Sequence, residues 1–378
     1  MSEENSVRNF SYVGLGRIFG ISLQAIFYLI FASILGPEKY GGLNVVVALA
    51  TTFSIASRFG MSISLQVYQA KQKSEISNQI KTLFIIFTSI AALILLSIDP
   101  YAAILTASLS FFIINQQNLL GLFQYKKFMI FTIIKSGLFF IIPFLLYFVL
   151  DLSGIVIGMS IANFVASAPF FKNLKIVSFT GLKAYKKTLI QNFLVDMAQF
   201  VYSLDKLLIS FLFGFLIVGI YQFNLQIFIG LTVLPQILLS YLISEESKGI
   251  THGKIISLAI IISVLVTAAV ILFAPFFVSE FFPDYSEGIF SLQILVVTLI
   301  PSTIGAILGS KLIARESSKV GFVSIIHIGI LLGLIIILGQ NFGLVGLSIA
   351  VLITNIVLVY LYYFLYRKMN NEKSQEFL

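Results

Sequence analysis

Long apolar runs recur along the whole chain, with only short polar interruptions between them. A helix needs roughly 20 apolar residues to cross a ~30 Å hydrocarbon core. We predict twelve such spans, at 18–35, 41–57, 82–98, 101–123, 128–150, 152–171, 189–213, 218–243, 255–279, 288–310, 320–339 and 343–366. Because 58% of the 378 residues are hydrophobic and only 11% are charged, a soluble domain with a single anchor is excluded. The sequence therefore predicts an all-α integral membrane protein.

The predicted spans form two sets of six around a basic segment. We expect an N-terminal six-helix bundle over residues 1–171, a basic cytoplasmic linker over 172–188 and a C-terminal six-helix bundle over 189–378. The segment 1–17 is polar and lacks the basic start and short apolar run of a cleaved signal peptide. The first span is therefore expected to remain in the mature protein.

The positive charges predict how the chain is oriented. Of the 24 lysines and arginines, 21 fall on one side of the predicted spans and only Lys39 on the other, while Lys135 and Lys206 lie inside spans. Cytoplasmic loops retain positive charge, so both termini are expected in the cytoplasm of a multi-pass protein of the cell membrane. The net charge of +8 is accounted for by loops that face anionic membrane lipids, and nothing separately indicates nucleic-acid binding.

Several functional classes lack the residues that they need. The chain has no cysteine and only two histidines, so we expect no metal site and no cofactor. A nucleotide-binding G-x-x-x-x-G-K-[ST] loop is absent, which excludes an ATP-driven pump. A membrane glycosyltransferase or polymerase would need paired acids, but the outer acids are scattered over very short loops. A channel would need a repeated filter element. We therefore expect a secondary transporter and no enzyme.

The inner loops are also too short for a catalytic domain. The longest of them, 58–81 and 172–188, are too small to fold alone. Any function is therefore expected to lie between the helices.

Two glycine turns indicate an internal repeat. Gly36 and Gly41 follow the first span, and Gly214 and Gly219 follow the seventh, each pair in the pattern G-x-x-x-x-G and with the same sequence offset from one pair to the other. Paired glycines permit a tight turn and a close approach of the next helix. Glycine also ends helices where no repeat exists. Read as a repeat, the turns predict two similar six-helix halves in parallel orientation.

The same segments carry a resemblance to a known family. Residues 35–42 (LGPEKYGG) with the RFG of 58–60, and later 204–209 (LDKLLI), 213–214 (FG) and 218–221 (VGIY), resemble polysaccharide repeat-unit flippases of the O-antigen type. These flippases belong to the multidrug/oligosaccharidyl-lipid/polysaccharide exporter superfamily. The resemblance implies a MATE-like fold of two six-helix bundles around a central cavity. It also implies a polyprenyl-phosphate-linked sugar as substrate, membrane lipids as surroundings and glycan-assembly enzymes as possible partners.

The seventh span carries a polar stripe. At 100° per residue, six polar side chains fall within about 40° of one line on this helix. They are Asn192, Asp196, Gln199, Ser203, Lys206 and Ser210. Ionisable groups at the centre of a membrane helix are costly, so the stripe is expected to face a wet cavity or partner residues. Lys206 would attract phosphate, and Asp196 and Asp205 are the candidates for ion coupling. Alternatively, Asp205 and Lys206 pair with neighbouring helices for assembly.

The first and eighth spans add further candidates for the substrate path. In the first span they are Arg17, Gln24 and Tyr28, and in the eighth they are Gln222 and Gln226. For Arg17, snorkelling to the membrane surface and a topological role explain its position as well as a substrate path does. Lys135 also lies within snorkelling reach of the inner surface. For Arg58, at the inner end of the second span, a topological role is favoured over phosphate binding.

The expected activity is therefore the flipping of lipid-linked sugar units across the membrane by alternating access. The alternative is a cation-coupled drug or metabolite antiporter of the MATE type. Such antiporters usually carry an acid in the first helix, and the first span here has none.

Overall fold

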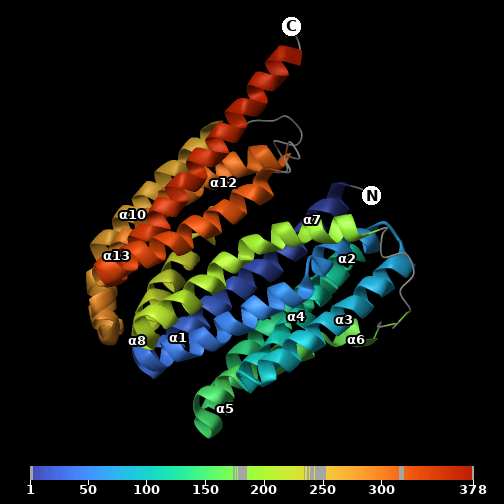
Figure 1. Ribbon diagram of the computed structural model, residues 1–378, viewed down its shortest axis with the longest axis horizontal. Coiled ribbons are helices and arrows are strands. Elements are labelled where there is room, and N and C mark those ends of the chain that lie inside the picture. Colours follow the sequence, from blue (N-terminus) through green and yellow to red (C-terminus); the bar gives the residue numbers. More distant parts are fainter. Residues whose placement is uncertain are drawn as a thin grey trace. The chain divides into compact units, whose positions relative to one another are not determined.

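The computed structural model describes residues 3–172, 175, 177, 185–233, 235, 238, 242, 253–314 and 319–376. Almost all of these residues are helical (Figure 1), which confirms the expected fold class. Eight of the described helical segments are long and apolar enough to cross a membrane. The expected linker at 172–188 lies mostly outside the described residues.

The chain forms two compact units, and the first comprises residues 1–30 and 42–207. Its elements are α1 (Glu3–Arg58) without residues 31–41, α2 (Met61–Ala70), α3 (Ser74–Leu96), α4 (Pro100–Gly121), α5 (Tyr125–Ala166), α6 (Ala168–Lys172), α7 (Lys186–Asp196), the 3-10 helix η2 (Met197–Phe200) and the start of α8 (Val201–Leu231). Helix α4 contacts α2, α3 and α5 and is thus the centre of this unit. Small polar residues join it to α1: Ser110 Oγ donates to Ser54 Oγ at 2.8 Å.

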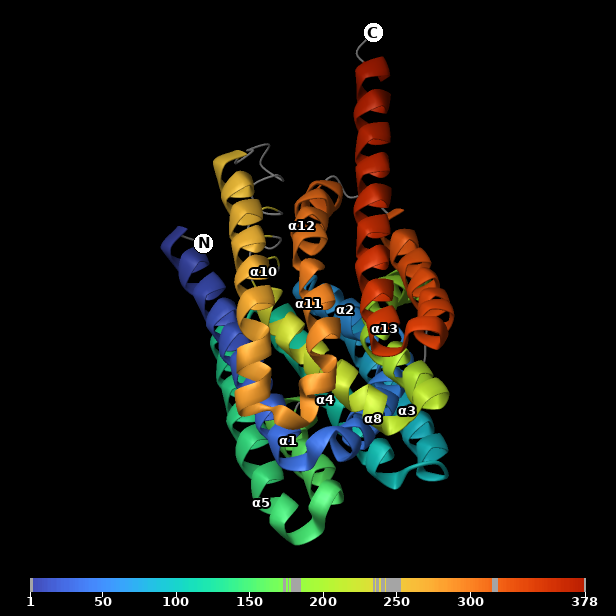
Figure 2. The same ribbon diagram turned by 90° about the vertical axis from the view of Figure 1, so that its left-hand side faces the viewer.

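The second unit comprises residues 31–41 and 208–378. Its elements are residues 31–41 of α1, the rest of α8, α10 (Gly253–Phe281), the 3-10 helix η3 (Pro283–Gly288), α11 (Ile289–Val297), α12 (Leu299–Ala314) and α13 (Lys319–Glu376). Figure 2 shows α10 beside α11 and α12, and α13 contacts both of the latter. Hydroxyl pairs again join the helices, with Ser291 and Ser348 at 2.7 Å and Ser263 and Thr303 at 2.7 Å. Such interhelical hydrogen bonds are typical of membrane proteins.

Four of the eight apolar segments contain a non-helical residue at which two helices join. These residues are Gly36 in α1, Asp151 in α5, Gly214 in α8 and Gly343 in α13. Eight segments, four of them double, correspond to the twelve predicted spans. The division predicted at 171 and 189 is a different grouping from the two contact-based units, and it stays a prediction.

The two glycine turns have the same backbone conformation and touch each other within the second unit. Gly36 has φ 67° and ψ 170°, and Gly214 has φ 80° and ψ 178°. A Cβ atom built on Gly41 would overlap the carbonyl oxygen of Phe215, and one on Gly219 would overlap the carbonyl oxygen of Pro37. Pro37 and Phe215 are related by the same sequence offset as the glycines. The contact is therefore reciprocal, and it gives the predicted repeat a three-dimensional basis.

A second pair of turns repeats with a different offset. Asp151 has φ 52° and ψ −138°, and Gly343 has φ 56° and ψ −136°. After each turn a glycine packs against the carbonyl of a preceding leucine, Gly154 against Leu146 and Gly346 against Leu338. One common offset relates the two turns, the two glycines and the two leucines, so the repeat extends to the last hairpin of each half.

Candidate functional site

The candidate site lies in the first unit, where the end of α1 meets α7. Phe59 (φ 41°) and Gly60 (φ 72°) turn the chain from α1 into α2. A Cβ on Gly60 would lie 2.9 Å from the carbonyl carbon of Asn192 and would collide with other backbone atoms of α7. The ring of Phe59 stacks on Phe193, with centroids 4.4 Å apart. The glycine thus lets α7 lie directly on the turn.

Polar side chains on α2 hold α7 in place. Asn192 Nδ2 donates to Ser64 Oγ at 2.7 Å, and the Tyr68 hydroxyl donates to Thr188 Oγ1 at 3.2 Å. The segment 61–70, which the sequence placed in an inner loop, is this helix α2 with five buried residues. The sequence did not predict this helix, because the packing of α2 against α4 and α7 is not visible in its short, polar-containing sequence.

Arg58 and Asp196 form the electrostatic centre of the site. Each residue is only 2% exposed, and their opposite charges attract each other. Arg58 Nε also donates to the carbonyl oxygen of Ser54 at 3.1 Å. The sequence favoured a topological role for Arg58 at the inner surface, but its burial shows a charge enclosed by the first unit. The predicted site residue Asp196 is thus buried in the same unit as Arg58, for which the sequence favoured a topological role.

Asp205 and Lys206 pair with each other. Asp205 Oδ1 accepts hydrogen bonds from the backbone nitrogen of Lys206 at 2.7 Å and from its Nζ at 3.4 Å. Both residues are buried. Part of the charge that would attract phosphate is balanced by the adjacent carboxylate.

Lys135 is enclosed by aromatic rings. Its Nζ lies 3.9 Å from the ring centroid of Phe139 and 5.5 Å from that of Phe112, and the residue is 9% exposed. Among the described residues, no acidic side chain forms an ion pair with it. The side chain was expected to snorkel towards the inner surface, but it points into the protein, where cation–π contacts stabilise its charge.

The remaining predicted residues are divided between the two units. Arg17 and Gln24 are exposed in the first unit, where Gln24 forms a hydrogen bond to the buried Tyr28. Ser203 is buried and donates to the carbonyl of Phe200 at 3.2 Å. The side chain of Gln199 lies outside the described residues. Gln222 and Gln226 are buried in the second unit.

A break in the seventh span changes the predicted stripe. Residues Met197–Phe200 form the 3-10 helix η2, and such a helix has about 3.0 residues per turn in place of 3.6. The turn per residue rises from about 100° to about 120°, so four residues shift the two flanking segments by roughly 80°. Ser203 and Lys206 after the break therefore lie at other angles relative to Asn192 and Asp196 than the predicted stripe assumes.

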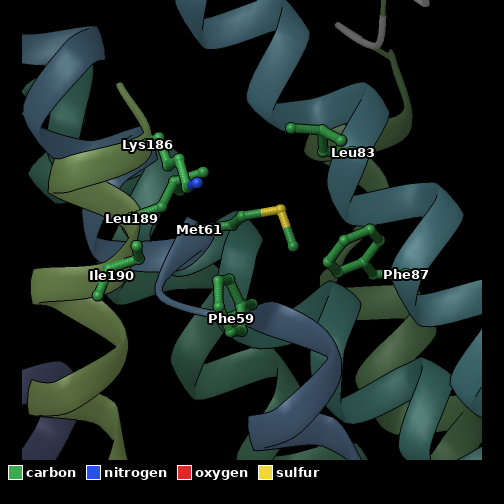
Figure 3. Close-up of a pocket in the computed structure, with 7 residues that line it drawn as sticks. All are labelled: Phe59, Met61, Leu83, Phe87, Lys186, Leu189 and Ile190. Atoms are coloured by element: carbon green, nitrogen blue, oxygen red, sulfur yellow. The ribbon is translucent and has the colours of Figure 1, made fainter. Parts of the chain in front are cut away.

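An apolar cavity of about 280 Å³ opens beside the site (Figure 3). Its walls come from the start of α2, from α3 and from α7, and they are Phe59, Met61, Leu83, Phe87, Lys186, Leu189 and Ile190. Lys186 is the only charged residue among these described wall residues. No group of three or more potential metal-ligating residues occurs in the described part of the chain.

Comparison with known proteins shows which fold these helices make. No model of a known protein family matches the sequence. An uncharacterized membrane protein of Methanocaldococcus jannaschii is 23% identical, over 91% of this chain and 94% of its own. The fold is that of MATE transporters: a multidrug resistance MATE family transporter of the MOP superfamily, in its inward-facing conformation, matches with a TM-score of 0.72 and 17% identity over 94% of this chain and 96% of its own.

Two further solved structures share this fold. The lipid II flippase MurJ, in an inward closed conformation, has a TM-score of 0.77 and 15% identity over 94% of this chain and 87% of its own. A mutant form of the MATE transporter VcmN of Vibrio cholerae has a TM-score of 0.60 and 16% identity over 96% of both chains. The expected MATE-like architecture is thereby confirmed.

Proposed function

We propose that this protein is a secondary transporter that flips lipid-linked oligosaccharide or polysaccharide repeat units across the cell membrane by alternating access. The observation that carries the proposal is the buried set of charges Arg58, Asp196, Asp205 and Lys206, within a fold that a lipid II flippase also adopts. Ionisable residues are expensive inside a membrane protein and are a default sign of a substrate or ion path.

The chemistry of these side chains suits a phosphate-bearing lipid with a sugar head. The planar guanidinium of Arg58 matches the oxygens of a phosphate, and Lys206 supplies a second cation. Asn192 and Ser64 provide amide and hydroxyl groups of the kind that replace water around a sugar. Asp196 is placed to respond when an anionic head group competes for Arg58, and it is the candidate for ion coupling together with Asp205.

The alternative is a cation-coupled drug or metabolite antiporter. It is favoured by the near-complete coverage of VcmN and of this chain in their alignment. It is opposed by the first span, which contains no acidic residue between 18 and 35. Genes for glycosyltransferases and sugar-nucleotide synthesis beside this gene would favour the flippase.

The test uses purified protein in liposomes that contain a fluorescent polyprenyl-diphosphate-linked oligosaccharide. Flipping is followed by the fraction of label that a membrane-impermeant quencher reaches. We expect activity from the wild type, at least a tenfold loss in Asp196→Asn and Lys206→Met, and normal activity in Lys126→Gln, which removes an exposed lysine. Full activity of both buried-charge variants would refute the path. Efflux of a cationic dye without any flipping would favour the antiporter.

A further inference from the structure

The cavity beside the candidate site has the chemistry of a lipid chain pocket. Six of its seven lining residues are apolar, and Figure 3 shows Met61 and Phe59 between the α3 side chains and the α7 side chains. Met61 is buried, whereas Phe87 is 39% exposed and Ile190 is 41% exposed, so the cavity is open at the surface of the first unit. The apolar walls of such an opening suit the apolar chain of a lipid.

One charge stands at the edge of this cavity. Lys186 is exposed and begins α7, and its neighbour Lys187 is exposed as well. No acidic residue lies in the first turn of α7, so the positive end of the helix dipole adds to the charge of the lysines. These lysines belong to the set that predicts the cytoplasmic side, which is the level of lipid phosphates. The apolar chain of a lipid whose phosphate lies at Lys186 would extend into the cavity.

We propose that this cavity binds a polyprenyl phosphate, with the phosphate at Lys186 and the first isoprenoid units between α3 and α7. The inference deepens the proposed function, because such a lipid is the carrier of the proposed substrate. The cavity volume of about 280 Å³ is nearly twice the ~150 Å³ of an apolar cavity that binds benzene. The lining contains two phenylalanine rings and branched side chains, against which the methyl branches of an isoprenoid chain can pack, and the flexible thioether of Met61 adapts to them.

The cavity is joined to the buried charges through one aromatic contact. Phe59 lines the cavity, stacks on Phe193 and directly follows Arg58 in the chain. Phe193 in turn lies one helical turn before Asp196 on α7. A lipid chain that fills the cavity would therefore stabilise the Phe59–Phe193 contact and the turn that follows Arg58.

Binding is testable by fluorescence because the chain contains no tryptophan. Phe87→Trp places a single reporter in the cavity wall, and Ile86→Trp places one at an exposed position of the same helix that does not line the cavity. Both proteins are placed in phosphatidylcholine nanodiscs and titrated with polyprenyl phosphate, polyprenol or phosphatidylglycerol. We expect a saturable emission change only for Phe87→Trp with polyprenyl phosphate. Adding Lys186→Gln should weaken this binding at least fivefold, whereas adding Lys126→Gln should not change it.

Each contrary result overturns the inference in a different way. An equal response to polyprenol would show that the phosphate and Lys186 do not contribute to binding. An equal response to phosphatidylglycerol would show that the cavity binds anionic lipids in general. No response from a folded Phe87→Trp protein would show that the cavity does not bind the lipid. Flipping by the wild type with a silent reporter would leave the proposed function standing alone. A reporter that binds polyprenyl phosphate in a protein that flips nothing would leave the binding site standing alone.

Discussion

Arg58 and Asp196 are both buried in the first unit and attract each other electrostatically, although they lie far apart in the sequence. Removing one member of a buried pair leaves an uncompensated charge, which typically costs about 3–5 kcal/mol. We expect Arg58→Gln and Asp196→Asn each to lower the melting temperature in detergent, and the double variant to lose less than the sum. The expected coupling is roughly 0.5–3 kcal/mol. Strictly additive losses would show that the two charges act independently.

The reciprocal glycine contact gives a second prediction. Because any side chain at Gly41 or Gly219 meets a backbone carbonyl, Gly41→Ala and Gly219→Ala should strongly reduce the yield of folded protein, as seen by size-exclusion chromatography. Gly230→Ala is the matched control, since it lies in the same helix as Gly219 and a Cβ placed there has no atom within 4 Å. Normal yields of both contact variants would contradict the packing of the two turns.

Backbone strain gives a third prediction. Gly343 has open space around a built Cβ, so Gly343→Ala isolates the cost of its positive φ, about 1–3 kcal/mol. Gly333→Ala, in the same helix and also in open space, should instead be neutral or slightly stabilising. Asp151 has the conformation of Gly343, and Asp151→Gly should relieve strain in α5. Thermal unfolding of the three variants measures these effects, and an equal response to both alanines would rule out strain at Gly343.

The aromatic surroundings of Lys135 give a fourth prediction. A buried cation held between aromatic rings is costly to desolvate, so Lys135→Met, which keeps most of the length of the side chain, should be neutral or stabilising for folding. Lys135→Ala should be destabilising because it leaves a hole between Phe112 and Phe139. If Lys135→Met unfolds more readily than the wild type, the charge itself holds the helices together. Flipping by the stable Lys135→Met protein then reports whether the cation also serves transport.

The parts of the fold that were predictable depend on local signals. Span lengths follow from runs of apolar residues, and the turns at Gly36 and Gly214 follow from glycine's freedom at positive φ. A break at Asp151 follows from the predicted spans 128–150 and 152–171, but its equivalence with the turn at Gly343 was missed because an aspartate stands in place of the glycine. The sequence offset between these two turns also differs from the one between the glycine turns, so a search at a single offset does not find them.

The candidate site was less predictable because its geometry depends on distant segments. Arg58 is buried where the end of α1 meets α7, and no pattern near residue 58 indicates that packing. The polar stripe on the seventh span was predicted with a constant turn of about 100° per residue, and the 3-10 helix η2 interrupts that regular α-helix. Asp196 was found from its rarity in an apolar span, whereas the cavity next to Lys186 required the packing of three helices.

The contact between the two glycine turns is isologous in the sense used for symmetric dimers: Gly41 meets Phe215 as Gly219 meets Pro37. One set of interactions thus serves both partners, as in an association of two identical chains. Such a contact is what a duplicated and fused gene would inherit from a six-helix ancestor that paired with itself. Substitutions at 41 and at 219 are therefore expected to have matching effects, because each meets a backbone carbonyl in the same way.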